Sequence, residues 1–172
     1  MATTYEAIAT VTVGSGGAAN IEFTSIPATY TDLNILLSLR QTATGGTNVN
    51  MAFNNSTTGY SNRNIISAAG TVVSESTILG TSSIKVGFIP ENTNYTANTF
   101  SNQYVYIPNY AGSTNKSVST DNAMENNSTS VYFGLFAGLW SNTAAITSIK
   151  LTPENGNFVQ HSSATLYGIK NS

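Results

Sequence analysis

DLNILLSLRQ, residues 32–41, is the stretch that decides the fold. Every second residue from Leu33 to Leu39 is apolar, and Asn34 and Ser38 stand at alternate positions between them. Successive side chains of a β-strand point to opposite faces, so a period of two residues predicts a strand with one buried face. A helix would repeat its apolar residues three or four positions apart. The stretch therefore predicts a β-strand that turns its leucine and isoleucine side chains toward a core.

The same period of two recurs along the chain, and no segment repeats at 3.6 residues over the length of a helix. In a second strand it places Val49, Met51 and Phe53 on one face. Polar breakers such as GSGG (14–17) and PENG (153–156) separate the apolar stretches. Besides residues 32–41, strands are predicted in YEAIATVTV (5–13), IEFTSI (21–26), NVNMAFNN (48–55), SIKVGFIP (83–90), FSNQYVYI (100–107), SVYFGLFAGLW (130–140), ITSIKLT (146–152) and FVQHSSATLYGI (158–169).

Eight or nine short strands joined by polar turns predict an all-β fold. In particular, they predict a single-domain antiparallel β-sandwich, a jelly roll of about eight strands. Residues 60–81 are rich in Ser, Gly and Ala and are predicted as a long loop, in which Val72 and Val73 mark one candidate strand. The length fits one domain, residues 1–172, in which residues 1–13 are expected as the first strand or as an N-terminal arm or swapped strand.

The chain carries very little charge. Charged residues make up 8% of the sequence, against about 25% in an average soluble protein, and the formal net charge is −2. The six Lys and Arg residues are scattered. Nucleic acid is therefore not expected as a partner, because its phosphates bind clustered cations, and an anionic membrane surface is not expected either.

Two further features concern the compartment of the protein. The chain has no cysteine, which excludes disulfide bonds and thiolate metal sites, so redox chemistry gives no indication of the compartment. Its N-terminus lacks the basic and apolar regions of a signal peptide, and its longest apolar run, residues 131–140, has half the length of a membrane span. A soluble protein made in a cytoplasm is expected.

YIPNYAGSTNKS, residues 106–117, raises the question of a phosphate-binding loop, because a Lys-Ser pair ends it. Such a loop requires G-x-x-x-x-G-K-[ST], since its glycines let successive backbone N–H groups turn toward the phosphates. Tyr110 and Asn115 occupy the two glycine positions here. The segment is therefore predicted to be a corner between two strands.

No catalytic, cofactor-binding or metal-binding residue is predicted. The one histidine, His161, has no G-x-S-x-G nucleophile to serve and is interpreted as a polar residue on a strand face. Asp121, Asn122 and Glu125 offer oxygen ligands, but they lack the regular spacing of a calcium loop. The eight acidic residues are dispersed, so a pair of carboxylates acting as in a glycosidase is the least favoured alternative.

Four aromatic residues are candidates for a binding surface: Tyr104, Tyr106, Tyr110 and Trp140. Aromatic rings stack on the apolar faces of sugars, and the many Asn side chains of the chain could bind sugar hydroxyls. The same rings could fill the core of the sandwich or an interface between subunits, where Tyr and Trp are enriched. The core or interface interpretation is favoured, and a glycan site is the alternative.

Four segments carry a resemblance to a known group of proteins. They are FTSIPATYTDLNILLSLR (23–40), YIPNYAGSTNKS (106–117), GLFAGLWSNTAAITSIKLTP (134–153) and NFVQHSSATLYGIK (157–170). The residues of these segments and their order along the chain resemble those of small structural proteins of tailed bacteriophages. Many of these proteins come from phages of marine and freshwater bacteria, including cyanobacteria. The resemblance covers most of the chain and is weakest around residues 60–98. It includes no catalytic signature.

The resemblance implies a non-catalytic structural protein on the surface of a virion, made in the host cytoplasm. The first expectation is a jelly-roll capsid decoration (cement) protein that clamps neighbouring major capsid subunits. The alternative is a tail-fibre or receptor-binding module that recognises host surface glycans. Expected partners are the major capsid protein or other virion proteins, and a homotrimer is the expected assembly. No cofactor is expected.

Overall fold

We describe the protein from a computed structural model, for residues 4–44, 48–68, 70–91, 95–127 and 131–170. In these ranges it contains twelve strands and no helix, hence none that could cross a membrane. The prediction of an all-β sandwich is confirmed. The strands are β1 (Tyr5–Thr12), β2 (Ile21–Phe23), β3 (Asp32–Leu39), β4 (Asn48–Phe53), β5 (Tyr60–Ala68), β6 (Thr71–Thr81), β7 (Ile84–Phe88), β8 (Ser101–Ile107), β9 (Lys116–Met124), β10 (Tyr132–Trp140), β11 (Ile149–Pro153) and β12 (Ser163–Ile169).

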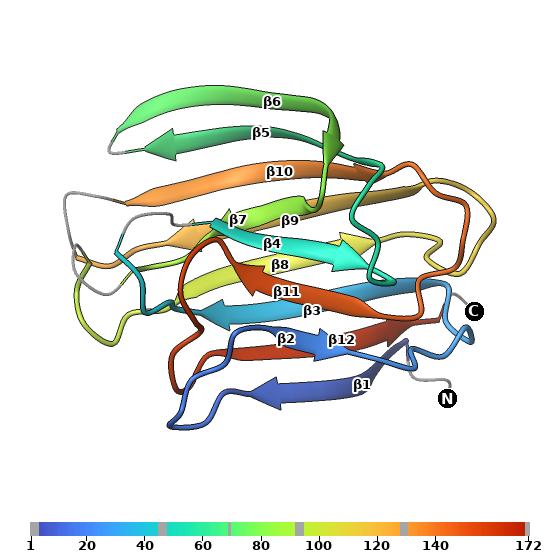
Figure 1. Cartoon of the computed structure of the whole chain (residues 1–172), viewed down its shortest axis with the longest axis horizontal. Coiled ribbons are helices and arrows are strands. Elements are labelled where there is room, and N and C mark those ends of the chain that lie inside the picture. The colour runs from blue at the N-terminus through green and yellow to red at the C-terminus, as the bar shows by residue number, and fades with distance from the viewer. Residues whose placement is uncertain (1–3, 45–47, 69, 92–94, 128–130, 171–172) are drawn as a thin grey trace.

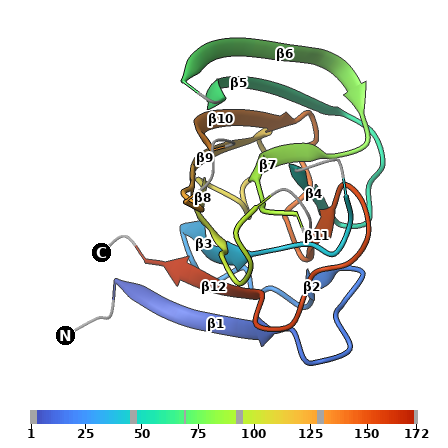
Figure 2. The same ribbon diagram turned by 90° about the vertical axis from the view of Figure 1, so that its left-hand side faces the viewer.

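The strands form two antiparallel sheets of unequal width. The larger has eight strands in the order β1-β12-β3-β8-β9-β10-β5-β6, and the smaller has four in the order β2-β11-β4-β7. Figure 1 shows the small sheet in front of the middle of the large one, with β5 and β6 extending beyond it. Figure 2 shows the two sheets as separate layers. One face of the large sheet is therefore covered by the small sheet, and its outer face is open.

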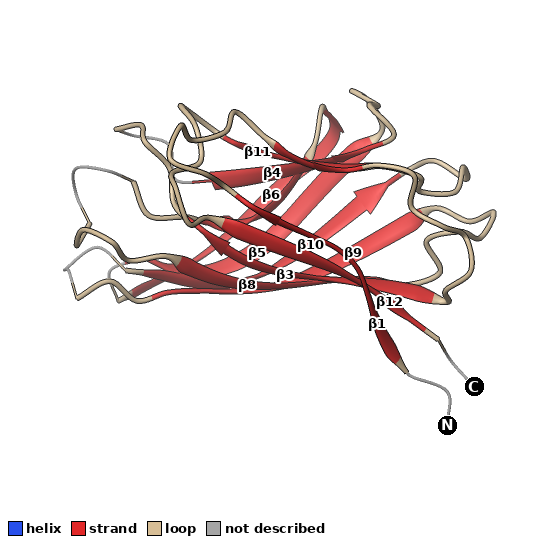
Figure 3. Ribbon diagram, turned by 90° about the horizontal axis from the view of Figure 1, so that it is seen from below, coloured by secondary structure: helices blue, strands red, loops and turns tan. Residues whose placement is uncertain are grey.

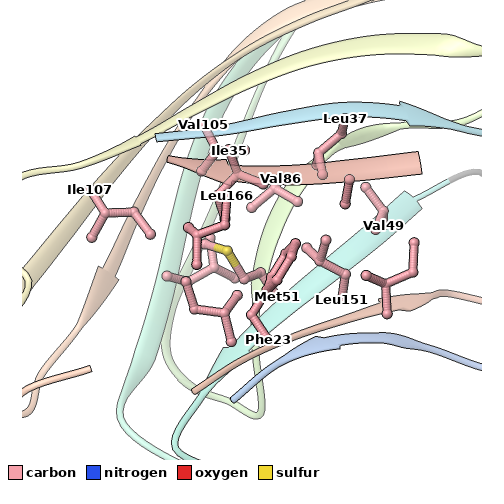
Figure 4. Close-up of a cluster of buried hydrophobic side chains, with 14 of the residues drawn as sticks. Phe23, Ile35, Leu37, Val49, Met51, Val86, Val105, Ile107, Leu151 and Leu166 are labelled. Atoms are coloured by element: carbon pink, nitrogen blue, oxygen red, sulfur yellow. The ribbon is translucent and has the colours of Figure 1, made fainter. Parts of the chain in front are cut away.

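The core lies between the two layers. The alternation predicted for residues 32–41 is confirmed, because Leu33, Ile35, Leu37 and Leu39 are all buried. The small sheet contributes the facing side chains, and the apolar residues of both layers interdigitate, as expected for sheets packed face to face. Figure 4 labels residues from both sheets in this cluster: Phe23, Ile35, Leu37, Val49, Met51, Val86, Val105, Ile107, Leu151 and Leu166.

Two strands, β5 and β9, lie outside the stretches predicted as strands, and the candidate strand at Val72 and Val73 is part of β6, so the structure has twelve strands instead of about eight. The prediction of a long loop over residues 60–81 is wrong, since this segment forms the hairpin β5–β6. Residues 116–124, at and after the end of the predicted corner, form β9, although their sequence has no apolar alternation. Its buried positions include Lys116, Thr120 and Asn122. Because these buried residues are polar, the alternation of buried and exposed positions does not appear as an alternation of apolar and polar residues.

Amide side chains of the large sheet cover the free edge of β7. Asn62 Oδ1 of β5 accepts a hydrogen bond of 2.7 Å from the Lys85 backbone N–H. Further along the strand, Asn122 and Gln103 bind the backbone of Phe88. An uncovered edge strand would expose backbone groups that can pair with another chain. These amides replace the missing neighbour strand and tie the two sheets together.

The first strand, β1, pairs antiparallel with β12 of the same chain and forms one edge of the large sheet. Figure 3 shows β1 and the end of β12 projecting together from the body of the sandwich. The predicted arm or swapped strand thus lies, from Tyr5 onward, as an edge strand of its own chain. Residues 1–3 lie outside the described ranges.

Candidate docking surface

The outer face of the large sheet carries an exposed apolar patch. We name it the outer-face patch and define it by six residues: Leu36 (β3), Tyr104 (β8), Phe133 and Leu135 (β10), Ile65 (β5) and Val72 (β6). They help to line an open groove of about 900 Å³. Phe133 and Leu135 are 58% and 61% exposed. In the sheet register, Asp121 of β9 lies between Tyr104 and Leu135, so it separates Leu36 and Tyr104 from the four patch residues of β10, β5 and β6. Large exposed apolar patches mark binding sites on soluble proteins, whereas single scattered apolar residues do not.

Strand β10 forms the centre of the patch because its sequence is apolar on both faces. Phe136 and Trp140 point into the sandwich and are buried. Phe133 and Leu135, at alternate positions, therefore point outward. The register places Leu135 directly opposite Ile65 of β5, which makes them a cross-strand pair on the outer face. The patch thus follows from strand geometry and needs no special loop.

Two opposite charges stand on this face. In β5, β8, β9 and β10, the exposed charged residues are Arg63 and Asp121. Asp121 lies beside Leu135 in the sheet register, and Arg63 lies beside Ala137. Within the described chain, neither side chain forms an ion pair or a hydrogen bond. The apolar groove is therefore accompanied by one anion and one cation that are available to a partner.

A smaller polar pocket of about 370 Å³ lies beside the patch. We call it the tyrosine pocket, and its lining includes Tyr5, Asp32, Tyr104, Tyr106 and Asp121. The Tyr106 hydroxyl donates a hydrogen bond of 2.9 Å to Asp32 Oδ2, and this bond raises the pKa of Tyr106. The pKa of Tyr104 is raised as well, chiefly by a hydrogen bond with Tyr5. Phenols and carboxylates gathered in this way could bind the hydroxyl groups of a ligand.

The structure divides the four aromatic residues that the sequence singled out. Trp140 is 2% exposed, and its ring packs at 6.0 Å from the ring of Tyr60 and at 5.6 Å from that of Phe53. Tyr110 is also buried, and its hydroxyl donates a hydrogen bond to the backbone oxygen of Pro27. These two rings belong to the core and are closed to a sugar.

The other two singled-out rings stay together. Tyr104 and Tyr106 lie two residues apart on the outer face of β8, and both line the tyrosine pocket. Of the four-residue surface that the sequence suggested, this pair is the part that a ligand could reach.

The corner predicted for residues 106–117 is confirmed, because turns separate the end of β8 from the start of β9. Lys116 turns inward and is buried. Its Nζ donates hydrogen bonds to the backbone oxygens of Gly112, at 2.6 Å, and Thr114. Burial lowers the pKa of Lys116. This lysine holds its own corner together and presents no charge to a phosphate.

Arg40 has a comparable internal role. Its guanidinium group is buried and donates to the backbone oxygens of Glu91, Thr96 and Thr99 at 2.8, 2.9 and 3.0 Å. These acceptors lie in the connection between β7 and β8. Two of the six cationic residues therefore serve inside the protein, which leaves its surface with even less positive charge than the sequence suggests.

The remaining candidates do not converge on one site. The interpretation of His161 as a strand residue is wrong, since it lies in the turn before β12, with φ at 72°. Asp121 and Asn122 point to opposite faces of β9, so they cannot ligate one ion together. Glu125 accepts hydrogen bonds from the backbone N–H groups of Asn126 and Asn127. Among the described residues, no three His, Asp or Glu side chains gather in a way that could hold a metal ion.

The sequence carries a signal for the patch in the strand at its centre. SVYFGLFAGLW is apolar at odd and even positions alike, and only one face of a sandwich strand can lie in the core. The second face must then either be covered by another layer or remain exposed. Which of the two occurs depends on the width of the opposite sheet, and that width is set by strands far away in sequence.

The chain matches no protein-family model, and a search of curated proteins finds no significant match.

Proposed function

We propose that this chain is a non-catalytic structural protein of a bacteriophage particle. In this proposal it is a capsid decoration protein that lies on the virion surface, binds other protein subunits and clamps neighbouring major capsid subunits. The observation that carries the proposal is the outer-face patch, an open apolar surface built on a rigid sheet. The assignment to a phage comes from the resemblance in residues 23–40, 106–117, 134–153 and 157–170.

The chemistry of the patch fits a protein partner. Interface centres are depleted in charge and enriched in aromatic residues, and Phe133 and Tyr104 supply exposed rings here. A strand presents its side chains at fixed positions, so binding through a sheet face orders few groups that were mobile before. Contacts with few ions are also insensitive to salt, because little of their binding energy can be screened. These properties suit a permanent contact on a particle exposed to changing solutions.

The order of the strands supports the jelly-roll interpretation. If the two inserted pairs β5–β6 and β9–β10 are set aside, eight strands remain. They pair as β1 with β12, β2 with β11, β3 with β8 and β4 with β7, all antiparallel. Such nested pairing, first strand with last, is what two Greek keys wound into a jelly roll produce. Jelly rolls occur in viral capsid domains and in lectins, so the topology is compatible both with a decoration protein and with a glycan-binding module.

The tyrosine pocket favours a second candidate function, a tail-fibre or receptor-binding module that recognises host glycans. Tyr104 offers an exposed ring, and Asp32, Asp121 and Tyr106 offer polar groups beside it. The pocket is small, however, and both oxygens of Asp32 already accept hydrogen bonds, from the Tyr106 hydroxyl and from the Asn109 N–H. We therefore rank this function second.

Electron microscopy of intact particles of the encoding phage tests the proposal. Density for this protein in many copies on the head surface is expected. A handful of copies at the tail would contradict the decoration role and favour the second candidate.

A binding experiment tests the role of the patch. Leu135→Asp should abolish binding of the purified protein to shells from which it has been stripped. Thr152→Asp is the matched control, because Thr152 is exposed on the small sheet and should tolerate the charge. Equal binding by both variants would show that the patch is not the docking surface.

A glycan array separates the second candidate from the first. Saturable binding of a sugar by the unmodified protein, lost in Tyr104→Ala, would support glycan recognition. Trp140→Ala is unsuitable for this purpose, because removing a buried indole lowers stability whatever the function.

A further inference from the structure

We propose that, in solution, the outer face pairs with the outer face of a second copy of this chain, related to the first by a two-fold axis. Self-pairing and docking on a particle use the same patch, so each excludes the other. This inference rests on the proposed protein-docking role of the outer face, and it does not depend on the assignment to a phage. The occupant follows from the arrangement of Arg63 and Asp121 on either side of the apolar strand β10.

The two charges are too far apart to neutralise each other within one chain. Asp121 on β9 and Arg63 on β5 are separated by β10 and by two residues along the strands. With about 4.8 Å between strands and about 3.4 Å per residue, their Cα atoms lie about 12 Å apart. The midpoint between them falls on β10, between Leu135 and Ala137. Each charge is therefore exposed without a counter-charge in its own chain and is available to pair with one from a partner.

A second copy supplies both counter-charges at once. A two-fold axis lying in the interface and passing over this midpoint brings Arg63 of each copy opposite Asp121 of the other. Isologous contacts of this kind use one self-complementary patch, as in most dimers. Leu135 then lies close to the axis and packs against its own counterpart, with Ile65 and Phe133 around it. The same symmetry operation thus covers the apolar centre and pairs the charges.

The geometry also defines the angle and the strength of the contact. Because the line from Arg63 to Asp121 runs diagonally across the strands, the two sheets cross steeply, closer to orthogonal packing than to aligned packing. Two crossed faces about 25 Å wide bury of the order of 600 Å² on each copy, at the lower end of stable interfaces. A reversible dimer with a Kd of about micromolar order is expected. The resemblance implies a trimer, so the number of chains distinguishes the two assemblies.

Charge exchange tests the pairing. The mass of the purified full-length chain is measured by sedimentation equilibrium over a range of concentrations. Asp121→Arg and Arg63→Asp, each alone, should raise the dimer Kd by about 10- to 100-fold, because each creates two like-charge contacts. The double variant Asp121→Arg with Arg63→Asp should return the Kd to within about threefold of the starting value, because it restores both pairs in exchanged positions. Both positions are exposed, and circular dichroism checks that each variant keeps the fold.

Several results would overturn the inference. They are a protein that stays monomeric at every concentration, a mass of three chains, and a dimer that responds equally to the single and the double exchange. A monomer that still binds to particles through the patch would remove the self-pairing alone and leave the docking role in place. Leu135→Asp that loses particle binding but keeps the mass of a dimer would also overturn the self-pairing, because Leu135 lies beside the proposed axis, and it would leave the docking role in place.

Discussion

The side chain of Asn122 in β9 binds both backbone groups of Phe88 in β7. Its Oδ1 accepts a hydrogen bond of 3.0 Å from the Phe88 N–H, and its Nδ2 donates one of 3.1 Å to the Phe88 oxygen. An amide side chain of the large sheet thus imitates the backbone of a neighbouring strand at the edge of the small sheet. Gln103 adds a second donor to the Phe88 oxygen at 3.0 Å.

Replacing Asn122 by Leu should lower the free energy of unfolding by about 1–3 kcal/mol. The Phe88 oxygen keeps Gln103 as a donor, but the buried Phe88 N–H loses its acceptor, and a buried unpaired group carries a penalty of this size. Denaturant unfolding measures the change. Asn102→Leu is the control, because Asn102 is exposed on β8 and its replacement should change the free energy by less than about 0.5 kcal/mol. Equal effects would contradict the role assigned to Asn122.

Replacing Gly87 by Ala should destabilise the protein by about 1–3 kcal/mol, the usual range for a strained backbone position. Gly87 has φ at 142°, which other residues rarely adopt, and an added Cβ would lie 2.9 Å from Cγ of Asn122. The midpoint of denaturant unfolding reports the loss. Gly14→Ala should leave the midpoint nearly unchanged, because a Cβ on Gly14 meets no atom within 4 Å. A stable Gly87→Ala protein would show that β7 can shift away from β9.

Replacing Arg40 by Lys should lower the free energy of unfolding by about 2–4 kcal/mol, although the charge is kept. The planar guanidinium group reaches backbone oxygens in two directions, and an ammonium group cannot reproduce this fork. Thermal and denaturant unfolding both measure the loss. The matched control is Arg63→Lys on the exposed outer face, for which a change below about 0.5 kcal/mol is expected. A similar small change at Arg40 would mean that the loop has other anchors of equal strength.

Stability should fall in alkaline solution, and Tyr95 should account for part of the fall. Burial raises the pKa of Tyr95 above its ordinary value of 10.0. Below about pH 10 the phenol is protonated in both states, and its contribution is fully present. As the pH rises further, the unfolded chain loses the phenolic proton first, so folding becomes less favourable by up to about 1.4 kcal/mol per pH unit for each such group.

Unfolding measured between about pH 8 and pH 11 checks this expectation. Tyr95→Phe should show a shallower decline than the unmodified protein above about pH 10, after both curves are aligned at about pH 8. Alignment removes the separate contribution of the hydroxyl group to packing. Parallel curves would exclude Tyr95 as a source of the decline.

A strand is predicted directly from the sequence where its buried positions are apolar. In β3, the alternation from Leu33 to Leu39 is enough to identify the strand and its buried face. In β9, the buried positions also alternate strictly, but Lys116 and Asn122 are among them. Asn122 binds the backbone of Phe88 in the other sheet, and this contact becomes visible only when the sheets are placed together. Lys116 binds backbone oxygens of its own corner, and its inward direction depends on how that corner folds.

The aromatic residues show that the sequence could predict the candidate site only in part. Trp140 and Phe133 belong to one strand, and their identities alone do not tell which of them faces the core. Phe133 and Trp140 are seven positions apart, so they lie on opposite faces of the strand. Which of the two faces the core is known only from the register of β10 in the sheet, because a shift of the register by one residue exchanges the faces. Tyr104 and Tyr106 are among the four rings that the sequence singles out, and they lie together, whereas the exposed Leu135 is not among its candidates.

The internal anchors Arg40 and Lys116 bear on tolerance of acid. Acid unfolds many proteins because carboxylates that hold cations become protonated and release them. The acceptors described above for these two cations are backbone oxygens, which do not titrate. Acidification therefore leaves the hydrogen bonds of Arg40 and Lys116 in place, both in the connection between β7 and β8 and in the corner between β8 and β9. A loss of structure at low pH has to begin elsewhere in the sandwich.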